Sequence, residues 1–117
     1  MSKKVYLAIP YTWNPEKSFE IANIVAAQLM EEGFVVFSPI SHSHSIAQYL
    51  PPSLLTDHEF WMRQDIPLVA WADQVIVVII GEDGYNLVEK SKGVQKELSI
   101  AKAIQLPINY RTIKYPL

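Results

Sequence analysis

Short, mostly apolar runs alternate along the chain with longer stretches in which apolar residues recur every three to four positions. The runs at Val5–Ile9, Phe34–Phe37 and Gln74–Ile80 are typical of strands buried on both faces of a parallel sheet. Ile108–Arg111 is expected to form a last strand. The alternation predicts an α/β fold of the flavodoxin or Rossmann kind. We expect an open parallel sheet of roughly four to five strands, in the order 2-1-3-4, with helices on both faces.

Three stretches have the spacing of helices. The first begins at Asn14, which suits a helix cap, and ends at Gly33. The second begins in the segment TDHE at positions 56–59, which has the form of a capping box, and Pro67 is expected to kink it or split it. The third covers Ser91–Ile104.

The polar stretches Ser38–Ser53 and Gly81–Lys90 are expected to be loops. Loops of such length in a compact domain are usually functional or mobile. In open parallel sheets, ligands bind beyond the carboxyl ends of the strands, where the strand order reverses. We therefore expect the ligand site among these two loops and the loop that starts at Pro10.

The third helix carries an acidic residue, Glu97, near the middle of its apolar face. An ionised carboxylate that turns inward needs partners or a raised pKa, so such acids are candidates for chemistry. Near the helix start, Gly93 lets a ligand approach the backbone, and Ser91 can cap the helix or hold an anion at its positive end. From periodicity alone, a boundary acid that reaches solvent is the simpler interpretation of Glu97.

Composition narrows the classes of function. Half of the 117 residues are apolar and 19% are charged, which predicts one folded domain over residues 1–117. A net charge of −2 without a basic block argues against binding to a nucleic-acid polymer, although a single nucleotide remains possible. The lack of cysteine excludes disulfides and fits a reducing cytoplasm. The N-terminal segment MSKK is too short for a signal peptide and the longest apolar run too short for a membrane span, so we expect a cytoplasmic protein without a membrane partner.

His42 and His44 alternate with serines in the expected loop Ser38–Ser53. This spacing could offer two imidazoles to a metal ion, but a third ligand at a suitable spacing is missing, although Asp57 and His58 lie downstream. We therefore expect no metal. The two histidines are either solvated loop residues or contacts of a sugar or phosphate.

The pattern S-x-G-V-x-x-E at Ser91, Gly93, Val94 and Glu97 resembles the signature helix of the nucleoside 2-deoxyribosyltransferase superfamily, which includes 2'-deoxynucleoside 5'-monophosphate N-glycosidases. The segments YLAIPYT, FSPISHSHS and HEFWMRQDIPLVAWADQVIVVI resemble the other parts of these proteins in the same order. The resemblance thus covers nearly the whole chain. It is strongest to a small family in the superfamily that shares the PY loop and the SPISHSH stretch.

The resemblance implies that Glu97 is a nucleophile that attacks the anomeric carbon of the sugar, expels the base and forms a covalent glycosyl-enzyme. It also implies that Asp65 assists by proton transfer or by positioning; from the residues alone, Asp65 could simply cap a helix piece that starts near Pro67. Water would then give hydrolysis and a second base would give exchange. Ser91 matches the serine that contacts the 5'-phosphate in the monophosphate hydrolases, whereas the nucleoside transferases have an aspartate there.

The first loop departs from the hydrolases, because it lacks the glycine and arginine with which they bind phosphate. Tyr11 and Thr12 still offer hydroxyl groups. Tyr11 either plugs the end of the first strand or donates a hydrogen bond beside the nucleophile, and we favour the donor because Tyr11 ends the first strand, at the expected ligand edge. Trp61 either stacks on a base or is buried in the core. The expected substrate-binding residues are Pro10, Tyr11, Thr12, His42, His44, Ser91, Gly93 and Val94.

Three functions therefore compete. The first is a cofactor-free enzyme that cleaves the N-glycosidic bond of a nucleoside or nucleotide. The second is a non-catalytic nucleotide-binding module, which the missing loop arginine favours. The third is a flavodoxin-like carrier, which ranks last because a carrier has no use for an inward Glu97. The aromatic content of 11% and the resemblance indicate a homo-oligomer.

Overall fold

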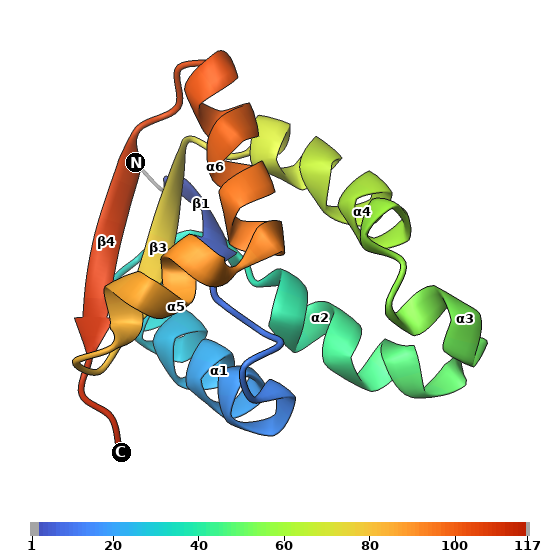
Figure 1. The fold of residues 1–117 in the computed structure, drawn as a ribbon. Helices are drawn as coiled ribbons and strands as arrows, with labels where there is room; N and C mark the ends of the chain where they lie inside the picture. The colour runs from blue at the N-terminus through green and yellow to red at the C-terminus, as the bar shows by residue number, and fades with distance from the viewer. Residues whose placement is uncertain (1–2, 117) are drawn as a thin grey trace.

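The computed structural model describes residues 3–116 of the chain; residues 1–2 and 117 lie outside that range. One parallel sheet has the strand order β2-β1-β3-β4, which confirms the predicted order. Figure 1 shows the sheet with helices packed around it. The elements are, in chain order, β1 (Lys4–Ala8), α1 (Pro15–Glu31), β2 (Val35–Phe37), α2 (Pro39–Ile46), a 3-10 helix (Ala47–Tyr49), α3 (Pro52–Leu55), α4 (His58–Trp71), β3 (Gln74–Ile80), α5 (Gly84–Lys90), α6 (Lys92–Ala103) and β4 (Ile108–Ile113).

Side chains that alternate along β1 and β3 divide the core into two layers. Val5 and Leu7 point to the face that α1 covers, where they pack with Ile76 and other apolar side chains. Tyr6 and Ala8 point to the opposite face, and α4 and α6 cover that layer through side chains such as Val69, Val94 and Leu98. Both central strands are buried on both faces, as their unbroken apolar runs predicted.

The helix α1 has the predicted ends. The side chain of Asn14 accepts a hydrogen bond from the backbone N–H of Lys17 at 3.2 Å, and a proline occupies the first turn. Gly33 has a φ of +102°, the left-handed conformation that glycine adopts after a helix. A short connection then returns the chain to β2, beside β1.

The prediction of a loop over Ser38–Ser53 is wrong, because the segment is mostly helical. Ser38 precedes a proline that suits a first helical turn, and Pro39 is buried. Ile40 packs against the core layer under α1. Serine and histidine have only moderate helix propensity, so the helix depends on this tertiary packing rather than on local preference.

Two other expectations need correction. Gly81–Lys90 is not only a loop, since α5 forms over most of it and buries Val88. Pro67 does not split the second predicted helix, because α4 continues through it to Trp71. That helix is capped by the side chain of Asp57, which accepts a hydrogen bond from the N–H of Phe60 at 3.1 Å. Among the described residues, no helix has the length and apolar character to cross a bilayer.

The first prediction concerns Gly84, at the start of α5. A Cβ atom there would lie 2.5 Å from Cγ2 of Ile79 and 2.9 Å from its carbonyl carbon, and a strand backbone cannot move away cheaply. We expect Gly84→Ala to lower the free energy of unfolding by about 1–3 kcal/mol, measured by urea denaturation. Gly93→Ala is the matched control, because its Cβ would meet only Cε of Met62 at 3.9 Å. Equal stability of the two variants would contradict this close packing of α5 on β3.

Candidate active site

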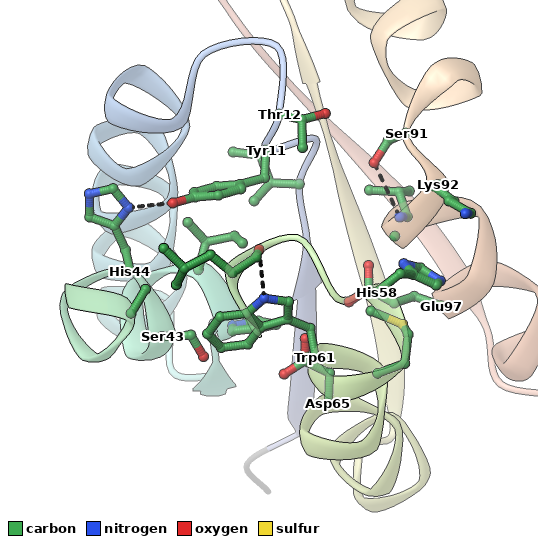
Figure 2. Close-up of a pocket in the computed structure, with 18 of the residues that line it drawn as sticks. Tyr11, Thr12, Ser43, His44, His58, Trp61, Asp65, Ser91, Lys92 and Glu97 are labelled. Atoms are coloured by element: carbon green, nitrogen blue, oxygen red, sulfur yellow. Dashed lines mark hydrogen bonds between the residues drawn. The ribbon is translucent and has the colours of Figure 1, made fainter. Parts of the chain in front are cut away.

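A cavity of about 460 Å³ opens at the carboxyl-terminal edge of the sheet, at the end of β1. Its walls come from the loop after β1, from α2, from α4 and from the start of α6, as Figure 2 shows. This position lies beside the β1–β3 pair, where the strand order reverses, as the topology predicted. The volume is within the range of small-molecule sites.

Glu97 lies in α6 and faces the sheet. The Ser91 cap fixes the start of this helix, and Glu97 then falls on the same face as Val94 and Leu98. Its side chain is only 5% exposed and lines the cavity, so the predicted inward orientation is confirmed and the solvent-exposed alternative is wrong.

A tyrosine from β1 holds this carboxyl group. The hydroxyl of Tyr6 donates a hydrogen bond to Oε2 of Glu97, and both side chains are buried. Among residues 3–116, no buried side-chain oxygen or nitrogen lacks a partner. The other carboxyl oxygen of Glu97 makes no hydrogen bond to these residues, so it is open to the cavity.

Burial has raised the pKa of Glu97 to about 8, and the nearby charge of Asp65 contributes in the same direction. The hydrogen bond from Tyr6 opposes this rise by favouring the carboxylate. Burial, together with the charges of Glu97 and Asp65, raises the pKa of Tyr6 far above its ordinary value. The tyrosine therefore keeps its proton and remains the donor of this pair.

Asp65 is the second acid of the cavity. It is 8% exposed, and burial raises its pKa to about 6. Because α4 runs unbroken from His58 to Trp71, Asp65 is not the cap of a separate helix piece. The cavity thus contains two carboxyl groups that ionise at different pH values, the combination used for acid–base and nucleophilic chemistry.

The start of α6 forms one wall. The Oγ of Ser91 accepts a hydrogen bond from the N–H of Val94 at 3.2 Å, so Ser91 is a helix cap and its own hydroxyl proton is left to donate. Gly93 lines the cavity where packing would tolerate a Cβ atom, so the protein core does not require a glycine there. Lys92 was not among the predicted binding residues, and it also lines this wall.

Most of the predicted binding residues meet at the cavity, but two do not. Tyr11, Thr12, His44, Ser91, Gly93 and Val94 line it together with both acids. Pro10 is buried outside the lining, and its carbonyl accepts hydrogen bonds from Oγ of Ser18 at 2.6 Å and from Nε1 of Trp13 at 3.1 Å. His42 is exposed and its ring lies 5.6 Å from that of Phe37. Neither residue lines the cavity, and their predicted contact with a substrate stays a prediction.

The position of His42 outside the cavity lining follows from the helix that replaces the predicted loop. In an extended loop, His42 and His44 would share a side, but in α2 the spacing of two residues directs them apart. Within residues 3–116, no three histidine or acidic side chains are grouped to bind a metal ion.

The expectation for Tyr11 is also corrected. Its hydroxyl pairs with Nδ1 of His44 at 2.7 Å, and Tyr6 is the tyrosine bound to Glu97. The sequence did contain a signal for Tyr6, since a hydroxyl in an otherwise apolar strand needs a buried partner. Trp61 lines the cavity and is fixed by a hydrogen bond from its Nε1 to the carbonyl of Leu55 at 3.1 Å.

Two solved structures share this fold. A 2-deoxyribosyltransferase from the psychrotolerant bacterium Bacillus psychrosaccharolyticus aligns over 97% of this chain and 75% of its own, with a TM-score of 0.63 and 23% identity. A 2-deoxyribosyltransferase from Leishmania mexicana aligns over 94% of this chain with a TM-score of 0.60 and 18% identity. The chain covers 64% of the length of the Leishmania protein.

The fold is therefore that of the nucleoside 2-deoxyribosyltransferases, as the sequence motif indicated. Within this fold class, the chain belongs to the family described as "Domain of unknown function (DUF1937)", whose model matches residues 3–112. A comparison with curated protein sequences finds no match.

The second prediction is a fall in stability as the pH rises. Between about pH 4.5 and 8, the unfolded chain has released the proton of Glu97 and the folded chain still holds it. The unfolded state then binds fewer protons, so the free energy of unfolding decreases with pH, on the order of 4 kcal/mol in total. Urea denaturation across this range measures the decrease.

Glu97→Gln is the test variant, because an amide has no proton to lose in this range. Asp65 completes its own titration at a lower pH. The variant should therefore show little change in stability between about pH 6.5 and 8.5 and should exceed the wild type at the upper end. If the free energy of unfolding changed with pH equally in the wild type and in Glu97→Gln, the raised pKa of Glu97 would be contradicted.

Proposed function

We propose that this protein cleaves the N-glycosidic bond of a nucleoside or of its 5'-monophosphate, with Glu97 as nucleophile. One observation carries the proposal: two buried carboxyl groups, Glu97 and Asp65, face a single cavity of small-molecule size at the switch point of the sheet. The shared fold with two 2-deoxyribosyltransferases supports a sugar–base bond as the target.

In the first step, the carboxylate oxygen of Glu97 that is open to the cavity attacks the anomeric carbon. The carbon–nitrogen bond breaks, its electron pair stays on the base, and Asp65 gives a proton to the base. Tyr6 holds the other carboxylate oxygen, so the attacking oxygen is already oriented. Before it bonds, the carboxylate also stabilises the positive charge that develops on the sugar.

In the second step, a water molecule attacks the anomeric carbon of the glycosyl ester. Asp65, now ionised, accepts the proton of that water, and the electron pair of the ester bond returns to Glu97. Hydrolysis is then complete and both carboxyl groups are restored. If the nitrogen of a second base attacks instead, the result is base exchange.

The scheme requires a particular protonation state of the two acids. The reactive form needs Glu97 ionised and Asp65 protonated, that is, one proton between the two acids. With apparent pKa values of about 6 and about 8, the pair holds one proton around neutral pH. Because Asp65 has the lower pKa, the more abundant form has the proton on Glu97, and the reaction starts from the less abundant form with the proton on Asp65.

The wall at the start of α6 can bind the 5' end of the sugar. Ser91 has a free hydroxyl proton and Lys92 has a positive charge. These groups favour a phosphate there. The loop after β1 offers Tyr11 and Thr12 but no arginine, so Lys92 would supply the cation.

The third prediction concerns the nucleophile. Incubation with a panel of deoxynucleosides, ribonucleosides and their monophosphates should release free base, detected by chromatography. Glu97→Gln should reduce the rate at least about a thousand-fold, because the amide cannot form the glycosyl ester. Glu89→Gln is the matched control, since it neutralises an exposed acid in α5. Base release by Glu97→Gln at the wild-type rate would overturn the role of Glu97.

The fourth prediction concerns pH. We expect a bell-shaped profile of kcat/KM with limbs near about pH 6 and pH 8, because only the state with one shared proton reacts. Asp65→Asn should be slower and should lose the alkaline limb, since no acid proton is left to lose. Its remaining limb should shift to lower pH, because the charge of Asp65 no longer raises the pKa of Glu97. An unchanged bell in the variant would contradict proton transfer by Asp65.

A non-catalytic nucleotide-binding module is the alternative, and the absence of an arginine from the first loop favours it. Calorimetry that shows tight nucleotide binding while chromatography shows no base release would select this function.

A cytoplasmic location and self-association also stay predictions, which fractionation and light scattering can test.

A further inference from the structure

A chain of hydrogen bonds forms the cavity wall on the side of α2. The hydroxyl of Tyr11 lies 2.7 Å from Nδ1 of His44, and Nε2 of His44 lies 3.2 Å from Oε1 of Glu16. The imidazole stacks on the ring of Phe19 at a centroid distance of 4.3 Å and is 14% exposed. Tyr11 and His44 line the cavity, whereas Glu16 lies outside it.

Glu16 determines where the protons of this chain lie. Its side chain is 83% exposed, and an exposed carboxylate at neutral pH only accepts hydrogen bonds. Nε2 of a neutral His44 must therefore carry the hydrogen, and Nδ1 has a lone pair. Because Nδ1 is an acceptor, the hydroxyl of Tyr11 must donate to it.

The polarity of Tyr11 toward the cavity follows directly. A phenol has one proton, and here it is directed at His44, so its oxygen offers only lone pairs to a ligand. Burial and the negative charge of Glu16 raise the pKa of Tyr11, which keeps this proton in place. A ligand group that meets this oxygen must be a hydrogen-bond donor, and a phosphate would be repelled.

The wall with Tyr11 and His44 lies across the cavity from the start of α6. Figure 2 shows Tyr11, His44 and Ser43 on one side and Ser91 and Lys92 on the other. Under the proposed function, a sugar attacked by Glu97 would lie near α6. The base, which leaves from the opposite side of the anomeric carbon, would then extend toward the α2 side.

We propose that Tyr11, oriented by His44 and Glu16, accepts a hydrogen bond from an amino group on the base, so that the protein selects nucleosides of amino-bearing bases. This inference rests on the proposed function, because the position of Glu97 sets the orientation of the substrate. Tyr11 contacts the base, whereas His44 and Glu16 are positioning residues. Trp61 lines the same cavity and offers an aromatic surface for the base.

The test compares ligands that differ only in the amino group. One pair is 2'-deoxyadenosine and purine 2'-deoxyriboside, and the other is 2'-deoxycytidine and its analogue with hydrogen in place of the amino group. Calorimetry measures the binding of each pair to Glu97→Gln protein, in which cleavage is blocked. In at least one pair, the amino compound should bind about ten-fold more tightly, the usual effect of one hydrogen bond.

Tyr11→Phe, added to the Glu97→Gln protein, should reduce the ratio of the two affinities to about one. Only the affinity for the amino compound should fall. Glu16→Gln should also lower the ratio, because an amide can donate to Nε2 of His44 and thereby free the proton of Tyr11. Glu20→Gln is the matched control on the same helix, since Glu20 pairs with Lys17 at 3.7 Å, and it should leave the ratio unchanged. A merely structural role of Tyr11 would weaken both ligands of a pair equally.

Equal affinities within both pairs, or a ratio that survives Tyr11→Phe, would overturn the inference, as would the absence of any nucleoside binding. These results are separate from the base-release assay on the wild type. If the wild type releases base but the amino and non-amino ligands bind equally, only the selection by Tyr11 is overturned. If the amino ligands bind more tightly but no base is released, the selection stands and the proposed cleavage of the N-glycosidic bond is overturned.

Discussion

The burial of one carboxyl group at the switch point of the sheet is the constraint on which the rest of the structure depends. Glu97 is almost fully removed from water, and such burial is costly unless a donor or a proton compensates for it. The hydroxyl of Tyr6 donates a hydrogen bond to Glu97. Because the pKa of Glu97 is raised, its carboxyl group is largely protonated at neutral pH. The position of α6 against β1 therefore determines both the cost of this burial and the protonation of the carboxyl group.

The cost of this burial explains why the two acids act as a pair. Asp65 lies in α4 and Glu97 in α6, helices that cover the same face of the sheet. The charge of one raises the pKa of the other, so the pair releases its protons in two steps. A domain selected for stability alone would have no reason to keep two acids out of water here.

The two cavity walls have different electrostatic character. The start of α6 has the hydroxyl of Ser91 and the cationic side chain of Lys92. The α2 side has the hydroxyl of Tyr11 paired with His44, whose other ring nitrogen contacts Glu16, and we infer that the Tyr11 oxygen is an acceptor there. A ligand with an anionic end and a donor-bearing end fits this arrangement, and a nucleotide has both. Under the proposed function, the polarity of the cavity would orient such a ligand before the reaction.

Much of the fold could be predicted from the sequence, because local patterns report burial. The apolar runs of β1 and β3 required a sheet covered on both faces, and the alternation of elements gave the order 2-1-3-4. Helical periodicity put Glu97 on the apolar face of α6, and the family resemblance then favoured an inward, reactive acid over one that reaches solvent. Local propensity failed for α2 and α5, where packing against the core stabilises helices that the polar sequence does not favour.

The sequence by itself therefore determined which side chains turn inward and at which edge of the sheet they gather. Only the tertiary structure decided which groups pair there. Tyr6 and Glu97 are 91 positions apart, and Tyr11 and His44 are 33 apart, so no local pattern relates them. Periodicity fixes the direction of a side chain relative to its own element, but the partner of a buried polar group depends on how separate elements pack together.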